Sequence, residues 1–183
     1  MKHIFYHLAA VMVVVVWGMT FISTKVLIVH GLSPQEIFLF RFLLAYAAVC
    51  PISFHRFFAR NLKDELYLVG GGVLGGSLFF FLQNIALGLT QASNVSFIIC
   101  TTPLLTAALT VLSVRMEKVS RGFIYGSIIA LLGVGLLIFN GSFILRISPL
   151  GDLLTLLASL SWAFYSLVIR SLTRKYSPAF ITR

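Results

Sequence analysis

The chain has 183 residues, of which 59% are hydrophobic and only 10% are charged, and its mean hydropathy is +1.01. Soluble globular domains carry roughly 25% charged residues, so this composition excludes an ordinary soluble domain. A net charge of +9 would suggest nucleic-acid binding in a soluble protein. Here the basic residues flank apolar segments, which membrane topology explains better, and no nucleic-acid partner is expected.

Six apolar segments occupy nearly all of the chain. A hydrocarbon core about 30 Å thick requires about 20 apolar residues of helix, and lipid cannot satisfy backbone polar groups outside a helix. The first segment lacks a small-residue cleavage site, which favours a retained crossing over a signal peptide. The sequence therefore predicts an all-α, polytopic transmembrane helical bundle that has the lipid bilayer as a partner. The predicted crossings are Phe5–Val29, Pro34–Phe54, Leu66–Gly88, Asn94–Val114, Gly122–Asn140 and Asp152–Ile169.

Lysine and arginine collect at alternate ends of these segments. Ten of them belong to one predicted side of the membrane, and Arg146 alone belongs to the other. The positive-inside rule assigns the rich side to the cytoplasm. We therefore expect a multi-pass protein of the plasma or inner cell membrane with a cytoplasmic N-terminus. The ten residues are Lys2, Arg56, Arg60, Lys63, Arg115, Lys118, Arg121, Arg170, Arg174 and Lys175.

Helix-capping signals agree with the predicted helix starts. Ser33 to Glu36 forms a capping-box pattern with Pro34 at the first helical position, and Ser120 can cap the fifth helix. Asp152 lies in the first turn of the sixth helix, where the helix dipole favours an anion. Structural roles at the interface are therefore preferred over proton transfer for the three acidic residues Glu36, Glu117 and Asp152.

Small residues recur four positions apart in the third and fifth helices. In lipid, such spacing permits close backbone contact between helices, so it predicts packing rather than a specific activity. The residues are Gly71, Gly75, Gly72 and Gly76 in the third helix and Gly122, Gly126, Ala130 and Gly133 in the fifth.

Residues suited to metal binding or hydrolysis do not form a recognisable arrangement. The histidines lie at or near helix ends, both cysteines lie within apolar segments, and no nucleophile–base pair shares a helix face. We expect no metal, no cofactor and no enzymatic activity. The residues concerned are His3, His7, His30, His55, Cys50 and Cys100.

Two cations lie within apolar segments. Arg41 is about seven residues into the second helix, roughly 10 Å beyond its start. A cation at such depth costs at least about 2.5–3.5 kcal/mol at the centre of a span, and it usually faces protein or water. It could face a solute cavity or snorkel to the interface. Lys25 lies nearer the end of the first helix, where it could contact solute or snorkel.

Other polar and aromatic side chains offer further candidates. Trp17 lies near the middle of its segment, away from the interfacial belt, and Thr20 shares its face, so the two could line a pocket or simply pack. The adjacent amide side chains of Gln83 and Asn84 could form hydrogen bonds to another helix or bind a ligand. Pro103 frees a carbonyl in mid-segment, which could create a substrate site or only a kink.

The sixth apolar segment resembles the first. Trp162 aligns with Trp17, and with a one-residue shift Ser177-Pro178 aligns with Ser33-Pro34. Five helices separate the two starts, so the second copy would be inverted in the membrane, as is common in secondary transporters.

These motifs resemble the EamA-type branch of the drug/metabolite transporter superfamily. The supporting segments include Trp17-Gly18, Arg41-Phe42, Gln83-Asn84-Ile85-Ala86-Leu87, and Gly151-Asp152-Leu153-Leu154 followed by Ser161-Trp162-Ala163-Phe164-Tyr165. The resemblance implies ten helices in two inverted five-helix repeats. Residues 5–140 would form the first repeat and residues 151–183 would begin the second. We therefore expect a missing second half or a homodimer partner.

The resulting hypothesis is a secondary transporter, a drug/metabolite permease that moves a small metabolite by alternating access. Because Arg41 has no deep acidic partner in the sequence, a carboxylate or phosphate of the solute could supply the counter-charge, as in an amino acid; an acidic residue of the absent half is the alternative. A non-transporting structural or assembly subunit is the competing function. The candidate substrate-binding residues are Trp17, Thr20, Lys25, Arg41, Gln83, Asn84, Thr102, Pro103, Trp162 and Tyr165.

Overall fold

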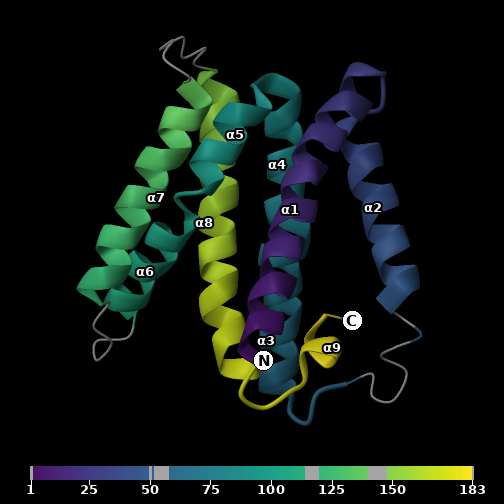
Figure 1. The fold of residues 1–183 in the computed structure, drawn as a ribbon. Helices are drawn as coiled ribbons and strands as arrows, with labels where there is room; N and C mark the ends of the chain where they lie inside the picture. Colours follow the sequence, from purple (N-terminus) through teal and green to yellow (C-terminus); the bar gives the residue numbers. More distant parts are fainter. Residues whose placement is uncertain (1, 50, 52–57, 114–119, 140–147, 183) are drawn as a thin grey trace.

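The computed structural model describes residues 2–49, 51, 58–113, 120–139 and 148–182, and its longer elements are all helical within these ranges. Several elements join end to end: α3, η2 and α4 make one segment, and α5 and α6 make another (Figure 1). The prediction of a polytopic helical bundle is confirmed. The elements are α1 (Lys2–Val29), α2 (Pro34–Val49), α3 (Leu62–Gly71), the π-helix η2 (Gly72–Leu78), α4 (Phe79–Leu89), α5 (Ala92–Ile99), α6 (Thr102–Ser113), α7 (Arg121–Phe139), α8 (Pro149–Leu172) and α9 (Pro178–Ile181).

Four of these segments are long and apolar enough to cross a bilayer. They are Ile4–Val29, Leu62–Leu89, Ala92–Ser113 and Pro149–Leu172. The other two predicted crossings correspond to α2, of 16 residues, and α7, of 19 residues. Large apolar side chains along α1 are exposed, as expected for a surface that faces lipid.

The helices alternate in direction, so the connections fall at two opposite ends (Figure 1). The N-terminus, the start of α3 and α9 lie at one end, whereas the α1–α2 and α4–α5 turns lie at the other. The helix α8 runs antiparallel to α1. Arg60 and Lys63 flank the start of α3, and Arg174 and Lys175 lie between α8 and α9, so these basic residues belong to the first end, in agreement with the predicted alternation of charge.

The α1–α2 turn is built from local hydrogen bonds. Gly31 has φ +99°, which glycine tolerates best, and its N–H donates to the carbonyl of Ile28 while that of Leu32 donates to Leu27. This pair of bonds is a Schellman motif. The predicted capping box follows: the Ser33 N–H donates to Glu36 Oε2 at 2.8 Å, and the Glu36 N–H donates to Ser33 Oγ at 3.2 Å. The turn fixes where α2 begins.

The helix α8 occupies the centre of the bundle and packs against α3, η2, α4, α5 and α6. The main buried cluster joins α1, α4, α5 and α8. Its buried members are Phe21, Phe79, Ala86, Leu87, Val95, Ile99 and Ala158, with Trp17 and Trp162 packed against them.

A π-helical turn interrupts the third crossing at its glycine-rich stretch. A Cβ atom added to Gly75 would lie 2.5 Å from the Tyr165 ring, and one added to Gly71 would lie 3.0 Å from Ile169. Ser161 of α8 also donates a hydrogen bond to the Leu74 carbonyl at 2.7 Å. The prediction is confirmed for Gly71 and Gly75, whose missing side chains let α8 approach. A Cβ atom added to Gly72 would meet nothing within 4 Å, and one added to Gly76 would lie 3.5 Å from Phe42, at an ordinary contact distance.

The glycine stripe of α7 has a different environment. A Cβ atom added to Gly122, Gly126 or Gly133 would meet nothing within 4 Å in the described part of the chain. The sequence spacing therefore identified close helix contact in the third crossing, but the described residues provide no such contact for α7.

Candidate functional site

A partly open cavity of about 920 Å³ lies between α1, α4, α5, α6, α7 and α8. Trp17 is near the middle of α1 and Trp162 is near the middle of α8, which places this part of the cavity at mid-depth, and the lining extends to Ser120 at the start of α7. Four of the ten predicted site residues line it: these two tryptophans, Thr102 and Pro103. The other six lie elsewhere in the bundle.

A break in the fourth crossing forms one wall of the cavity. The helix α5 ends at Ile99 and α6 begins at Thr102, with Cys100 between them on the cavity. Proline at position 103 lacks the N–H that would bond to the carbonyl of Ile99, so a continuous helix is disfavoured here. The predicted interruption by Pro103 is therefore present, and it directs both half-helices toward one site.

Aromatic rings form the opposite wall. The ring centroids of Trp17 and Trp162 are 5.7 Å apart, and the Phe79 centroid is 4.7 Å from that of Trp162. Offset aromatic pairs at such distances each contribute about 0.5–1.5 kcal/mol beyond burial. The two tryptophans aligned in sequence thus meet each other across the two antiparallel helices.

Threonine residues of α6 lie on the same space. Thr102, Thr106 and Thr110 all line the cavity and are spaced by four residues, which puts them on one helix face. Sequence reasoning selected the first of these and missed the other two, although the spacing was available as a signal. It also missed Phe79, Phe123 and Ser166, whose positions depend on tertiary packing.

Arg41 does not line the cavity. Its guanidinium Nη2 donates to Thr24 Oγ1 at 3.1 Å, and its Cζ lies 5.8 Å from the Phe80 ring centroid. A cation over an aromatic face gains about 0.5–2 kcal/mol. The side chain is half-buried between α1, α2 and α4, and both of these neighbours are neutral.

Lys25 caps a helix end. Its Nζ donates to the carbonyls of Leu87 at 2.5 Å and Thr90 at 2.9 Å, at the C-terminus of α4. A cation is favoured there by the helix dipole. Thr90 also donates to Asp152 Oδ1 at 3.2 Å, and the Ser148 N–H donates to Asp152 Oδ2 at 3.1 Å. These contacts join α1, α4 and α8, and they give Asp152 the structural role predicted for it.

The remaining candidates lie outside the cavity lining, in packed or buried positions. Gln83 is fully buried, and neither side-chain amide atom has a partner among the described residues. Asn84 Nδ2 donates to the Pro34 carbonyl at 3.5 Å. Thr20 donates to the carbonyl of Trp17 in its own helix at 2.6 Å, and Tyr165 packs on the glycines of the third crossing.

Metal binding receives no positive evidence. Within the described ranges, His, Cys, Asp and Glu do not form any group of three or more that could hold a metal ion. Cys50 and His55, for which no site was predicted, and Glu117, for which a structural role was predicted, lie outside the described residues.

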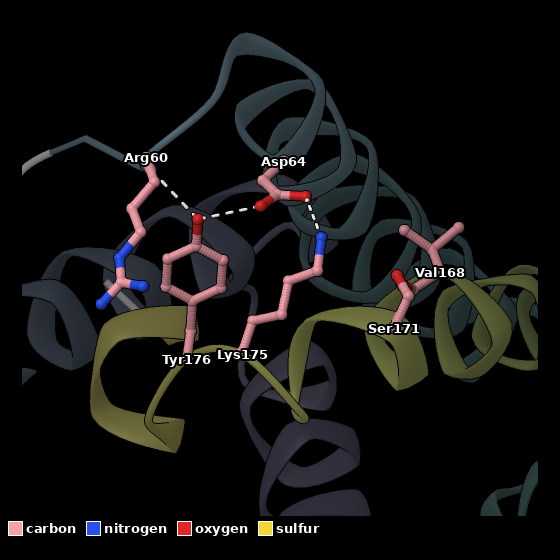
Figure 2. Close-up of polar contacts among 6 residues, drawn as sticks. All are labelled: Arg60, Asp64, Val168, Ser171, Lys175 and Tyr176. Atoms are coloured by element: carbon pink, nitrogen blue, oxygen red, sulfur yellow. Dashed lines mark hydrogen bonds and ion pairs between the residues drawn. The ribbon is translucent and has the colours of Figure 1, made fainter.

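A second polar cluster lies at the end of the bundle that carries the N-terminus (Figure 2). Asp64, at the start of α3, is 4% exposed and accepts hydrogen bonds from Lys175 Nζ and Tyr176 Oη, each at 2.9 Å. The Arg60 N–H donates to the Tyr176 hydroxyl at 3.0 Å. The hydrogen bond to Asp64 raises the pKa of Lys175 above its ordinary value. The cluster joins parts of the chain more than 100 residues apart.

Comparisons with known proteins agree with this architecture. The model of the EamA-like transporter family matches residues 4–139. A curated relative, the uncharacterized transporter YcxC of Bacillus subtilis (strain 168), is 27% identical over 175 residues, which cover 93% of this chain and 55% of the relative. The chain thus spans about half the length of that relative. No solved structure matches the chain.

Proposed function

Because the chain belongs to the EamA-like transporter family, we propose that it forms at least part of a secondary transporter that moves a small organic metabolite by alternating access. The observation that carries this proposal is the mid-depth cavity between α1, α4, α5, α6, α7 and α8. Broken helices and solute sites near the membrane midplane are typical of secondary transporters. Family membership also favours transport over an enzymatic activity.

The arrangement of α1 and α8 supports the inverted-repeat interpretation. They run antiparallel, and Trp17 contacts its sequence counterpart Trp162. Each of the two helices is followed by a serine and then by the proline that begins the next helix, Ser33-Pro34 after α1 and Ser177-Pro178 after α8. The Ser177 side chain accepts a hydrogen bond from the N–H of Phe180. We propose that residues 5–140 and 151–183 belong to two repeats and that a second half or a homodimer partner completes the bundle.

Transport can be tested even while the solute is unidentified. The product of the intact gene is reconstituted in liposomes, and mass spectrometry identifies which members of a defined metabolite mixture cross the membrane. Ala107 lines the cavity, whereas its neighbour Ala108 is exposed and does not. Ala107→Trp should abolish the flux, and Ala108→Trp should retain it. Absence of any protein-dependent flux, or equal flux through both variants, contradicts the proposal.

The competing structural-subunit function makes the opposite prediction for the same experiment. The close helix packing at Gly75 and Tyr165 is consistent with this competing function, because it shows that small residues mediate helix contact. It does not account for a cavity of about 920 Å³ at mid-depth. Transport is therefore the better supported function.

The N-terminus is proposed to be cytoplasmic, because basic residues gather at its end of the bundle. In a background with Cys50→Ser and Cys100→Ser, His30→Cys should react with a membrane-impermeant maleimide on intact cells. Arg174→Cys, at the opposite end, should react only after permeabilisation. The reverse pattern contradicts the assignment.

A further inference from the structure

The chemistry of the cavity lining restricts the solute that it can hold. The wall is mainly apolar and includes several aromatic rings and a few hydroxyl groups, and the lining residues within the described chain include no Asp, Glu, Lys, Arg or His. A charged group that leaves water without a counter-charge or a full set of hydrogen bonds loses several kcal/mol. The site is therefore suited to an uncharged molecule.

One polar group of the wall lacks a partner. Thr102 is 7% exposed, and its hydroxyl oxygen has no hydrogen-bond partner among the described residues. By contrast, the hydroxyls of Ser96, Thr110 and Ser166 donate to carbonyls of their own helices. Leaving a buried hydroxyl unpaired is destabilising. The oxygen itself is buried, so a bound molecule reaches it only after the Thr102 side chain rotates toward the cavity, and a hydrogen bond formed there would remove the cost.

The aromatic wall complements a planar ring. Trp17, Trp162 and Phe79 lie within stacking distance of one another, and all three line the cavity. Phe79 is fully buried, so a bound ring would contact the partly exposed Trp17 and Trp162, where it gains dispersion and the preferred offset or edge contacts. This wall and the rotated Thr102 hydroxyl thus provide one aromatic and one polar contact in the same space.

We infer that the cavity binds an uncharged aromatic molecule that carries a hydrogen-bonding group, with its ring on the Trp17–Trp162 wall and its polar group on Thr102. This inference rests on the proposed function for its biological meaning, but the binding site can be tested by itself. It differs from the anionic or zwitterionic solute expected from Arg41, which lies outside the cavity.

Three probes of equal ring size separate charge from shape: 4-nitrobenzyl alcohol is neutral, 4-nitrobenzoate is an anion and 4-nitrobenzylamine is a cation at neutral pH. Nitroaromatic rings quench indole fluorescence on contact, and both tryptophans of the 183-residue sequence line the cavity. The full chain is titrated in detergent, with Trp17→Phe and Trp162→Phe to assign the signal. We expect the alcohol to bind at least about tenfold more tightly than either charged probe, the ratio given by 1.4 kcal/mol.

Matched variants locate the polar contact. Thr102→Val should weaken binding of the alcohol about three- to tenfold, in keeping with one hydrogen bond, whereas Thr102→Ser should restore it. Thr101→Val is the control, because the Thr101 hydroxyl donates to the Ile98 carbonyl and does not line the cavity. Equal affinity for all three probes, preference for a charged probe, or equal losses in the two valine variants would overturn the inference.

The two proposals fail in different ways. Binding of the neutral probe without any transport in liposomes would support the proposed binding site and contradict the transport function. Transport that is blocked by Ala107→Trp, combined with no preference among the probes, would support the transport function and contradict the inferred class of solute.

Discussion

Arg41 and Lys25 are both cations within apolar helices, but their surroundings give them different predicted roles. Lys25 donates to two carbonyls at a helix end, so its charge has a defined structural partner. Arg41 has one hydroxyl partner and one aromatic face. Neither residue lines the cavity, which removes the geometric basis for assigning both to one solute site.

Lys25→Met should lower the stability of the protein while its folded fraction binds solute normally. Hydrogen bonds from a charged donor contribute about 1.5–3 kcal/mol each, and the two freed carbonyls would lack that donor. Thermal unfolding in detergent gives the stability, and tryptophan quenching gives the affinity. Ser23→Ala is the control, because the exposed Ser23 hydroxyl bonds only within α1. Normal stability with lost affinity would instead make Lys25 a solute contact.

Arg41→Gln should leave the affinity for the neutral aromatic probe within about twofold of the original, since its guanidinium is outside the cavity. Uptake of acidic, zwitterionic and cationic solutes should be compared for both proteins. A selective loss of acidic or zwitterionic uptake by the folded variant would support an anion site at Arg41 in place of the neutral one.

Within the third crossing, glycine spacing and the π-helical turn have a common consequence. Gly71 and Gly75 lie on the side that α8 approaches, and Ser161 of α8 bonds to a carbonyl of η2. Short π-helical turns within α-helices often occur at functional positions. Here the turn lets α8 pack closely and so helps to place Trp162 on the cavity.

Gly75→Ala should destabilise the bundle by about 1–3 kcal/mol, as an overpacked contact does. The added Cβ would lie 2.5 Å from Cγ of Tyr165, which is near the root of that side chain and cannot easily move away. Gly72→Ala is the matched control, because its Cβ would meet nothing within 4 Å and alanine favours a helix. Thermal unfolding of both variants tests the claim, and equal unfolding temperatures would contradict it.

At the scale of the whole molecule, the sequence predicted the helices and their caps well because both depend on local physics, and four of the six predicted crossings correspond to segments long and apolar enough to span a bilayer. The Ser33–Glu36 box and the Ser120 cap of α7 both form as expected, the latter through a 3.1 Å bond from the Phe123 N–H. The candidate site was predicted less well. Depth in a helix does not specify which neighbour a side chain faces, so Arg41 and Lys25 could not be separated from cavity residues such as Thr106.

The two ends of α8 connect distant parts of the chain. At one end Asp152 contacts Thr90, and beyond the other end Lys175 contacts Asp64 (Figure 2). In the proposed division into repeats, both contacts join residues 5–140 to residues 151–183. The contact between Asp64 and Lys175 is an ion pair, so its electrostatic contribution to stability can be tested.

A double-mutant cycle with Asp64→Asn and Lys175→Met should give a small favourable coupling, because solvent screens the Lys175 side chain, which is 55% exposed. The pKa of Lys175 is raised by this pair. Its contribution is therefore fully present below the ordinary lysine pKa of about 10.4 and is lost as pH rises through the raised value. Thermal unfolding should give the same coupling between about pH 7 and 9. Arg174→Met, at the exposed neighbouring position, should show no coupling to Asp64. A coupling of zero, or one that disappears within this pH interval, would show that the ion pair does not stabilise the contact between α3 and the segment after α8.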